Sequence, residues 1–388
     1  MSKYKTDEER RARIYPVILS EYNPAWPEWY AEEKANLERL VEIENIARIS
    51  HFGSTAVPGL TAKPTIDILL EISEAADIDK LITSLSPYYI YLKEESAPTV
   101  LTPPLHLMFL KGYLSDGFAE KVYHIHVVRA GDWDERLLFK DYLIAHPEIA
   151  TEYASLKRAL FEKFEFDRDG YTAAKGVFIK QITDKAKMIA HYDALIDENN
   201  DPVHDPAPLK AHMDKWDSAA LIEALQLKPD KSVLEIGVGT GRLAVRVCGN
   251  CNRFTGIDIS PKTIERAKEN LRDYGNVELV YNDFLDYEFM CRFDVIYSSL
   301  TFIHIADKWA AIQKVTTLLN DSGRFVLSIS KSQDKVLDLG NRQVPLYPAL
   351  SDEITALLTK TGLVIEQQFE TEFAVIFAAR KGGLHYES

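Results

Sequence analysis

Apolar and polar residues alternate with two different periods in the C-terminal half of the chain, which begins near residue 200. Short apolar runs typical of buried strands are separated by stretches with the apolar spacing of a helix. The predicted strands are 232–236, 253–258, 278–281, 293–298 and 323–328, and the predicted helices are 241–247, 261–273 and 309–318. Strands that alternate with helices predict βαβ units, and therefore a Rossmann-like α/β sheet with helices on both faces.

The end of the chain has a different pattern. Two strand-like runs, 363–369 and 372–380, are separated by only a short break. So short a connection predicts a hairpin. We therefore expect an antiparallel strand to close the otherwise parallel sheet.

The N-terminal half is mixed, with most of its strands before most of its helices. Strands are predicted at 48–52, 65–72, 106–110 and 123–128, and helices at 29–42, 134–145, 147–164 and 171–192. Strands that precede helices, rather than alternating with them, favour an α+β fold.

A linker is predicted where apolar periodicity stops. Residues 197–208 read DENNDPVHDPAP, a stretch of prolines, acidic residues and asparagines. The chain has 388 residues, which is too long for one ordinary hydrophobic core. We expect two domains, 1–196 and 209–388, joined by this linker.

Composition restricts the classes of partner. The apolar share of 46% and charged share of 27% are those of a folded protein. A formal net charge of -14 opposes attraction to nucleic acid or anionic membrane. Apolar runs stay short of the roughly 20 residues needed to cross a bilayer, and the N-terminus lacks a secretory apolar region. We therefore expect a cytoplasmic protein with neither a nucleic acid nor a membrane as partner.

A glycine-rich turn follows the strand at 232–236. Gly237, Gly239 and Gly241 come directly after the acidic residue Glu235, and the next strand ends at Asp258. Glycines permit positive φ and close approach of a ligand, and a helix start offers free N–H groups. An acidic residue at the end of the second strand can accept hydrogen bonds from both hydroxyls of a ribose.

Two features distinguish this turn from a dinucleotide site. The dinucleotide fingerprint is G-x-G-x-x-G, whereas Arg242 occupies the position of its last glycine here. Glu235 would also repel a pyrophosphate and attract a cationic amino acid. The terminal hairpin favours the same conclusion.

With these motifs, the C-terminal half resembles a class I S-adenosylmethionine (SAM)-dependent methyltransferase. The segments VLEIGVGTGRL, TGIDIS, NDF at 282–284 and FDVIYSSL at 293–300 carry the resemblance. It implies that Glu235 faces the methionine ammonium directly or through water, Asp258 the ribose and Asp283 the adenine. The full set of implied cofactor-binding residues is Glu235, Gly237, Gly239, Thr240, Gly241, Asp258, Ile259, Asn282, Asp283, Phe284 and Ser298.

His304 is the candidate general base, because it follows the fourth strand at the edge where an acceptor should enter. The alternative is that it packs there and hydrogen-bonds to the backbone. No Asn-Pro-Pro-Tyr-type motif follows the strand, which argues against amino methylation of DNA bases. The resemblance implies a small-molecule methyl acceptor.

The N-terminal half has a second candidate site in HFGSTAVPGL and KPTIDILLE. A strand ends in Gly53 and Ser54, which can bind phosphate through N–H groups and a hydroxyl. The next strand carries Asp67, and a strand carboxylate can hold Mg²⁺. Lys63 and Lys175 would add positive charge at the same edge.

These segments, with HIHV at 124–127 and YLIAHP at 142–147, resemble the GrpB family, whose core is similar to the nucleotidyltransferase fold. Active nucleotidyltransferases carry a second carboxylate two residues after the first, where this chain has Leu69. Alternation places Glu71 on the same face as Asp67. His124 and His126 also share a face and could supply metal ligands, or be ordinary hydrogen-bonded strand histidines.

The sequence thus predicts an enzyme that transfers methyl groups from SAM, with an N-terminal domain that binds a nucleotide or another phosphate and has Mg²⁺ as its candidate ion. One alternative is a nucleotidyltransferase with an accessory methyltransferase domain. Another is a non-catalytic SAM-binding or scaffold protein.

Overall fold

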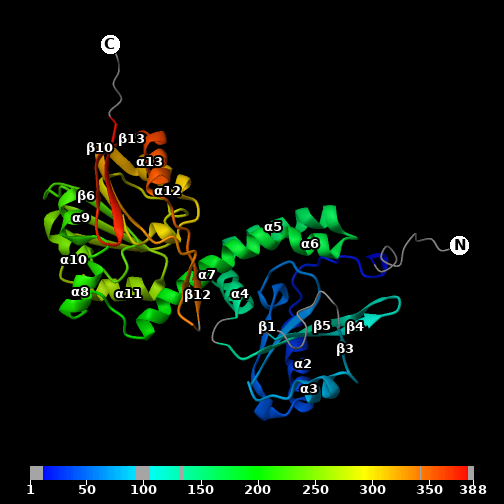
Figure 1. Ribbon diagram of the computed structural model, residues 1–388. Coiled ribbons are helices and arrows are strands. Elements are labelled where there is room, and N and C mark those ends of the chain that lie inside the picture. Colours follow the sequence, from blue (N-terminus) through cyan, green and yellow to red (C-terminus); the bar gives the residue numbers. More distant parts are fainter. Residues whose placement is uncertain (1–11, 93–104, 132–133, 341, 383–388) are drawn as a thin grey trace. The chain divides into compact units, whose positions relative to one another are not determined.

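The computed structural model describes residues 12–92, 105–131, 134–340 and 342–382, and Figure 1 shows its elements. The chain divides into two compact units, Met1–Ala186 and Lys187–Ser388. The division falls inside helix α7 (Gly176–Asp197), upstream of the predicted linker. Asp201, within that predicted linker, is buried and accepts hydrogen bonds from Asn270 and Arg266. This segment therefore packs on the second unit.

The first unit is built on a five-stranded sheet, as expected for an α+β fold. The order is β1-β2-β5-β4-β3, in which only β2 and β5 are parallel neighbours. The strands are β1 (Ile46–Phe52), β2 (Ile66–Ile72), β3 (Ile90–Tyr91), β4 (His106–Leu114) and β5 (Gly117–Arg129).

Alternation along β2 and β5 gives the sheet two different faces. Ile66, Ile68 and Leu70 join Ile125 and other apolar residues in a core with α2 (Trp26–Leu40) and α3 (Ile78–Leu85). The intervening residues Asp67, Glu71, His124 and His126 therefore lie on the opposite face. The helices α4 (Glu135–Ala145), α5 (Pro147–Phe164) and α6 (Arg168–Ala174) complete the unit with the first part of α7.

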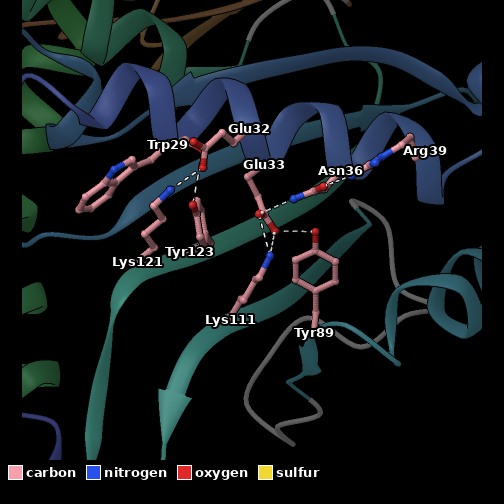
Figure 2. A network of polar contacts seen from close by, with 9 residues as sticks. All are labelled: Trp29, Glu32, Glu33, Asn36, Arg39, Tyr89, Lys111, Lys121 and Tyr123. Carbon is pink, nitrogen blue, oxygen red and sulfur yellow. Dashed lines mark hydrogen bonds and ion pairs between the residues drawn. The ribbon is translucent and has the colours of Figure 1, made fainter.

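The buried carboxylate of Glu33 links α2 to the sheet through hydrogen bonds. Glu33 accepts hydrogen bonds from Lys111 of β4, at 2.7 and 2.8 Å, and from the hydroxyl of Tyr89, at 2.7 Å (Figure 2). Asn36, one turn further along α2, donates to Glu33 as well. The charge of Glu33 is thus fully compensated where α2 contacts the sheet.

The second unit has a seven-stranded sheet of order β13-β14-β10-β9-β6-β7-β8. The strands β6 to β10 run parallel, and β14 pairs antiparallel with both β10 and β13. This confirms the α/β sheet and its terminal hairpin. The strands are β6 (Ser232–Ile236), β7 (Arg253–Asp258), β8 (Val277–Tyr281), β9 (Phe293–Ser299), β10 (Leu319–Ser330), β13 (Leu363–Glu370) and β14 (Ala374–Lys381).

Helices cover both faces of this sheet. Leu234 and Phe325 face one core, which includes residues of α12 (Lys308–Leu318) and α13 (Ser351–Lys360). Val233 and Val326 face the other, with residues of α9 (Ser218–Ala224), α10 (Ala244–Val247) and α11 (Pro261–Asn270). A short helix, α8 (Ala207–Met213), and a small hairpin, β11 (Val336–Asp338) and β12 (Gln343–Pro345), complete the unit.

Some elements differ from their predicted bounds. The helix after the glycine-rich turn begins at Ala244 rather than Gly241, because Gly241 has φ +97 and cannot be part of a right-handed helix. The single helix predicted for 171–192 is two helices that break at Lys175. Within the described residues, no helix combines the length and apolar character needed to span a lipid bilayer.

Candidate functional sites

The glycine-rich turn after β6 holds three glycines in the left-handed region, with φ +76 at Gly237, +55 at Gly239 and +97 at Gly241. A Cβ on Gly237 would overlap Thr301, and a Cβ on Gly241 would press against Leu271. A Cβ on Gly239 would meet nothing within 4 Å. Two glycines therefore allow close packing of the turn, and the third borders open space.

Glu235 lies at the end of β6 and is almost completely buried. The hydroxyl of Tyr297 donates a hydrogen bond of 2.7 Å to its carboxylate. Burial raises the pKa of Glu235 to about 8, although Tyr297 and Arg242 act in the opposite direction. A carboxylate held in this way favours a cationic ligand group, because a nearby positive charge stabilises its ionised form.

Asp258 ends β7 beside the same turn. Its two oxygens accept backbone hydrogen bonds of 3.0 Å from Gly239 and from Ser260. Burial raises the pKa of Asp258, and these hydrogen bonds oppose the rise. A carboxylate offers about four acceptor positions, more than these backbone donors occupy, so Asp258 can also accept from a ligand hydroxyl.

The other predicted cofactor residues lie near this edge of the sheet in different environments. Thr240 is buried, and its side chain lies beside the carboxylate of Asp201, whose pKa it helps to lower. Asn282 and Asp283 begin the loop after β8, and the carboxylate of Asp283 accepts from the backbone of Leu285. Phe284 packs in the core, and the Ser298 hydroxyl donates to the Ile236 carbonyl. Ile259 directly follows Asp258.

His304 is held by a residue that the sequence motifs did not indicate. Its Nε2 lies 2.7 Å from the hydroxyl of Tyr192 on α7, and its Nδ1 is buried without a partner in the described structure. Burial lowers the pKa of His304 to about 4. Asp193, which follows Tyr192 on α7, accepts a 2.7 Å hydrogen bond from Ser260. The end of α7 therefore lies along the edge that carries Asp258 and His304.

A buried ion pair lies next to the glycine-rich turn. Arg242 forms two hydrogen bonds to Asp217, which is fully buried and also accepts from Ser299 at 2.7 Å. Arg242 occupies the position of the last glycine in the dinucleotide fingerprint. Its ion pair with Asp217 explains why this turn has an arginine there. No sequence motif indicated three of these residues, Tyr192, Asp193 and Asp217. Their only signal was their place in or beside a predicted helix.

In the first unit, Asp67 of β2 lies near two histidines of β5. Nδ1 of His124 is 3.3 Å from Asp67 Oδ1, and ligand atoms of Asp67, His124 and His126 all lie within 4.8 Å of one another. A Cβ on Gly53 would overlap the Asp67 carboxylate, and Gly53 has φ +72. Gly53 therefore makes room for Asp67.

Lysine side chains gather beside this group. Lys157 donates to Ser54 Oγ at 3.2 Å, while Lys63 and Lys175 lie over the ring of Tyr171, at 4.6 and 4.5 Å from its centroid. Burial and the neighbouring cations lower the pKa of Lys63 and of Lys157 to about 7. In the described residues, neither Lys63 nor Lys175 forms an ion pair with a carboxylate. We call Lys63, Lys157 and Lys175 the lysine cluster.

Glu71 shares the face of Asp67, as alternation predicts, but its carboxylate is paired with Arg48 through two hydrogen bonds. The structure therefore brings Gly53, Ser54, Lys63, Lys175 and Asp67 together and places Glu71 in a separate pair.

Comparisons with known proteins match a different family to each half of the chain. The GrpB protein family matches residues 16–185, and a methyltransferase domain family matches residues 227–370. Glutamate-rich protein GrpB of Alkalihalophilus pseudofirmus is 33% identical over 172 residues, which cover 43% of this chain and 93% of that protein.

Two methyltransferases are similar to the other half. Malonyl-(acyl-carrier protein) O-methyltransferase 1 of Ilyobacter polytropus is 30% identical over 103 residues, which cover 26% of this chain and 38% of that protein. The magnesium protoporphyrin IX methyltransferase of Synechocystis PCC 6803, crystallised with SAM, is 19% identical with a TM-score of 0.43, covering 51% of this chain and 97% of that one.

Proposed function

Since the chain belongs to the GrpB family through its N-terminal half and carries a methyltransferase domain in its C-terminal half, we propose that it transfers a methyl group from SAM to a small-molecule acceptor. The observation that carries the proposal is the arrangement around the turn after β6. Glu235 and Asp258 flank Gly239, which borders open space.

These residues fit the parts of SAM. Asp258 has acceptor positions left for the ribose hydroxyls, and the buried carboxylate of Glu235 suits the methionine ammonium. Asn282 and Asp283 follow β8, where they would reach the adenine. When bound, SAM supplies an electrophilic methyl group on a sulfonium.

The chain's own contribution is to position the reactants and exclude water, since an in-line displacement depends on alignment. Tyr192 and Asp193 of α7 cover the edge that carries Asp258 and Ser260. His304 is neutral at pH 7, but its pKa of about 4 and the contact of its Nε2 with Tyr192 make it a weak base, so alignment of the reactants carries the proposal. The acceptor is a small molecule rather than nucleic acid, in keeping with the charge of -14.

Calorimetry with S-adenosylhomocysteine (SAH) tests the cofactor site. Asp258→Ala removes two hydrogen bonds to a charged acceptor, so affinity should fall by at least about 100-fold. Asp273→Ala is the matched control, because that side chain is 89% exposed on the same unit. Unchanged affinity in Asp258→Ala would refute the site. SAH formation from SAM in the presence of a metabolite extract would then separate an enzyme from a binding protein.

A second function is proposed for the N-terminal unit, on the evidence of the lysine cluster. Lys157 is buried and Lys63 and Lys175 are partly buried, and clustered cations removed from water are costly unless an anion binds them. We infer that Lys63, Lys157 and Lys175, with Ser54, bind a phosphate-bearing ligand such as a nucleotide. Phosphate or nucleotide titration should detect binding that Lys63→Met and Lys175→Met weaken, with Lys180→Met as the charge-matched control, because the Lys180 side chain is 70% exposed. Equal binding by all variants would contradict this role.

A further inference from the structure

The group of Asp67, His124 and His126 has the geometry of a metal site. The three residues come from two neighbouring strands, β2 and β5, and lie on the sheet face opposite α2. Their ligand atoms all lie within 4.8 Å of one another, and each side chain is partly exposed. Metal–ligand bonds of roughly 2.0–2.2 Å would require only a small closure of this group.

The strand register explains why these positions meet. In the parallel pairing of β2 with β5, Asp67 lies opposite His124 and Leu69 lies opposite His126. Leu69 occupies the position at which active nucleotidyltransferases carry their second carboxylate. The neighbouring strand therefore offers an imidazole beside the place where β2 offers no ligand.

Each imidazole is oriented by a second polar group. Nε2 of His124 lies 2.7 Å from the hydroxyl of Tyr113, to which Arg168 donates at 3.1 Å. Nδ1 of His126 lies 2.9 Å from Nε2 of His106. Nδ1 of His124, which faces Asp67 Oδ1 at 3.3 Å, and Nε2 of His126 are therefore the nitrogen atoms that would coordinate. A metal-binding histidine characteristically has its other ring nitrogen hydrogen-bonded in this way.

We propose that Asp67, His124 and His126 bind a divalent transition-metal ion. Two imidazoles and one carboxylate suit Zn²⁺, Mn²⁺, Fe²⁺ or Co²⁺, whereas Mg²⁺ prefers oxygen ligands. Three protein ligands leave coordination positions open for water or a ligand oxygen.

The lysine cluster indicates what fills an open position. Gly53 lies directly against the Asp67 carboxylate, and Lys157 donates to the adjacent Ser54 at 3.2 Å, so the lysine cluster lies beside the metal ligands. A phosphate oxygen on the metal would place the remaining phosphate charge toward the lysines. This last step rests on the phosphate-binding role proposed above, while the metal site does not depend on it.

Titration of the chelator-treated full-length chain with Co²⁺ alone, in phosphate-free buffer, tests the metal site. We expect one Co²⁺ per chain, with a visible absorption spectrum that reports nitrogen and oxygen ligands, and much weaker binding of Mg²⁺. Asp67→Asn and His126→Gln should each weaken Co²⁺ binding at least about 10-fold, and Tyr113→Phe should weaken it through His124. His212→Gln, an exposed histidine of the other unit, should not.

Circular dichroism of each variant separates lost coordination from lost folding. If the wild-type chain does not bind Co²⁺, or if Asp67→Asn and His126→Gln both bind it as well as wild type, the metal site is wrong and Asp67 and His124 form an ordinary hydrogen-bonded pair. Phosphate titration of the metal-free chain tests the lysine cluster separately. Phosphate binding without Co²⁺ binding would therefore overturn only the metal, and Co²⁺ binding without phosphate binding only the phosphate ligand.

Discussion

The hydroxyl of Tyr192 and Nε2 of His304 lie 2.7 Å apart, and the two rings meet edge-on with centroids 5.5 Å apart. This contact joins the end of α7 to the 3-10 turn Phe302–His304 that follows β9. It encloses His304, and burial lowers the pKa of that imidazole to about 4.

The lowered pKa of His304 predicts a loss of stability in mild acid. An unfolded histidine has a pKa near 6.5, so between pH 6.5 and about 4 the unfolded chain binds a proton that the folded chain does not. The stabilisation is present above pH 6.5 and is lost as the pH falls through this window. Urea unfolding at pH 7 and 4.5 should show a loss about 1–3 kcal/mol larger for wild type than for His304→Gln. Equal losses would mean that His304 is not effectively buried.

Glu235 predicts that cofactor binding releases a proton. Burial raises its pKa to about 8, so the carboxyl is largely protonated at pH 7 in the free chain. The ammonium of SAH favours the ionised form, which lowers that pKa on binding. Calorimetry in buffers of different ionisation enthalpy should therefore report release of up to about one proton at pH 7.

The matched variant for this measurement is Glu235→Gln, which keeps the shape of the side chain and cannot ionise. Its SAH binding should be weaker, and the binding enthalpy should no longer depend on the buffer. A buffer-independent enthalpy in the wild-type chain would show that Glu235 is already ionised or does not face the ammonium.

The sequence predicted the elements around both sites because their signals are local. The strand that ends in Asp258 and the turn with three glycines are each encoded within a few residues, and both formed as expected. Alternation along one strand also placed Asp67 and Glu71 on the same face. It could not show that Glu71 is already paired with Arg48, because that partner belongs to another strand.

Contacts between distant segments were not predictable from local patterns. The register that sets Leu69 beside His126 depends on the pairing of β2 with β5, which are separated by two other strands along the chain. Tyr192 and Asp193 lie in a helix with ordinary amphipathic spacing, so nothing in the pattern marked their contacts with His304 and Ser260.

The buried pair of Glu33 and Lys111 predicts a large stability difference between two similar lysine substitutions (Figure 2). Lys111→Met leaves the carboxylate of Glu33, which is 2% exposed, without its cation, and should cost about 3–5 kcal/mol. Lys121 pairs with Glu32, which is 60% exposed, so Lys121→Met should cost at most about 1 kcal/mol. Urea unfolding of the N-terminal unit measures both. Equal costs would show that Tyr89 and Asn36 alone compensate Glu33.

The contacts made by the end of α7 predict at which residue a stable fragment of the second unit must begin. A fragment 209–388, which begins after the proline-rich segment, lacks Tyr192, Asp193 and Asp201, whereas a fragment 187–388 keeps their bonds to His304, Ser260 and Arg266. Losing these side-chain hydrogen bonds, at roughly 0.5–1.5 kcal/mol each, should make the shorter fragment about 2–4 kcal/mol less stable. It should also bind SAH more weakly, because Asp193 and Tyr192 cover the edge next to Asp258.

Fragments 1–186 and 1–196 provide the complementary comparison, and we expect both to unfold cooperatively with similar midpoints. Urea unfolding and SAH titration of all four fragments measure the two effects. If 209–388 matches 187–388 in stability and affinity, α7 contributes nothing to the second unit, and the proline-rich segment is the true boundary. If 1–186 is molten while 1–196 folds, the last turns of α7 belong instead to the first unit.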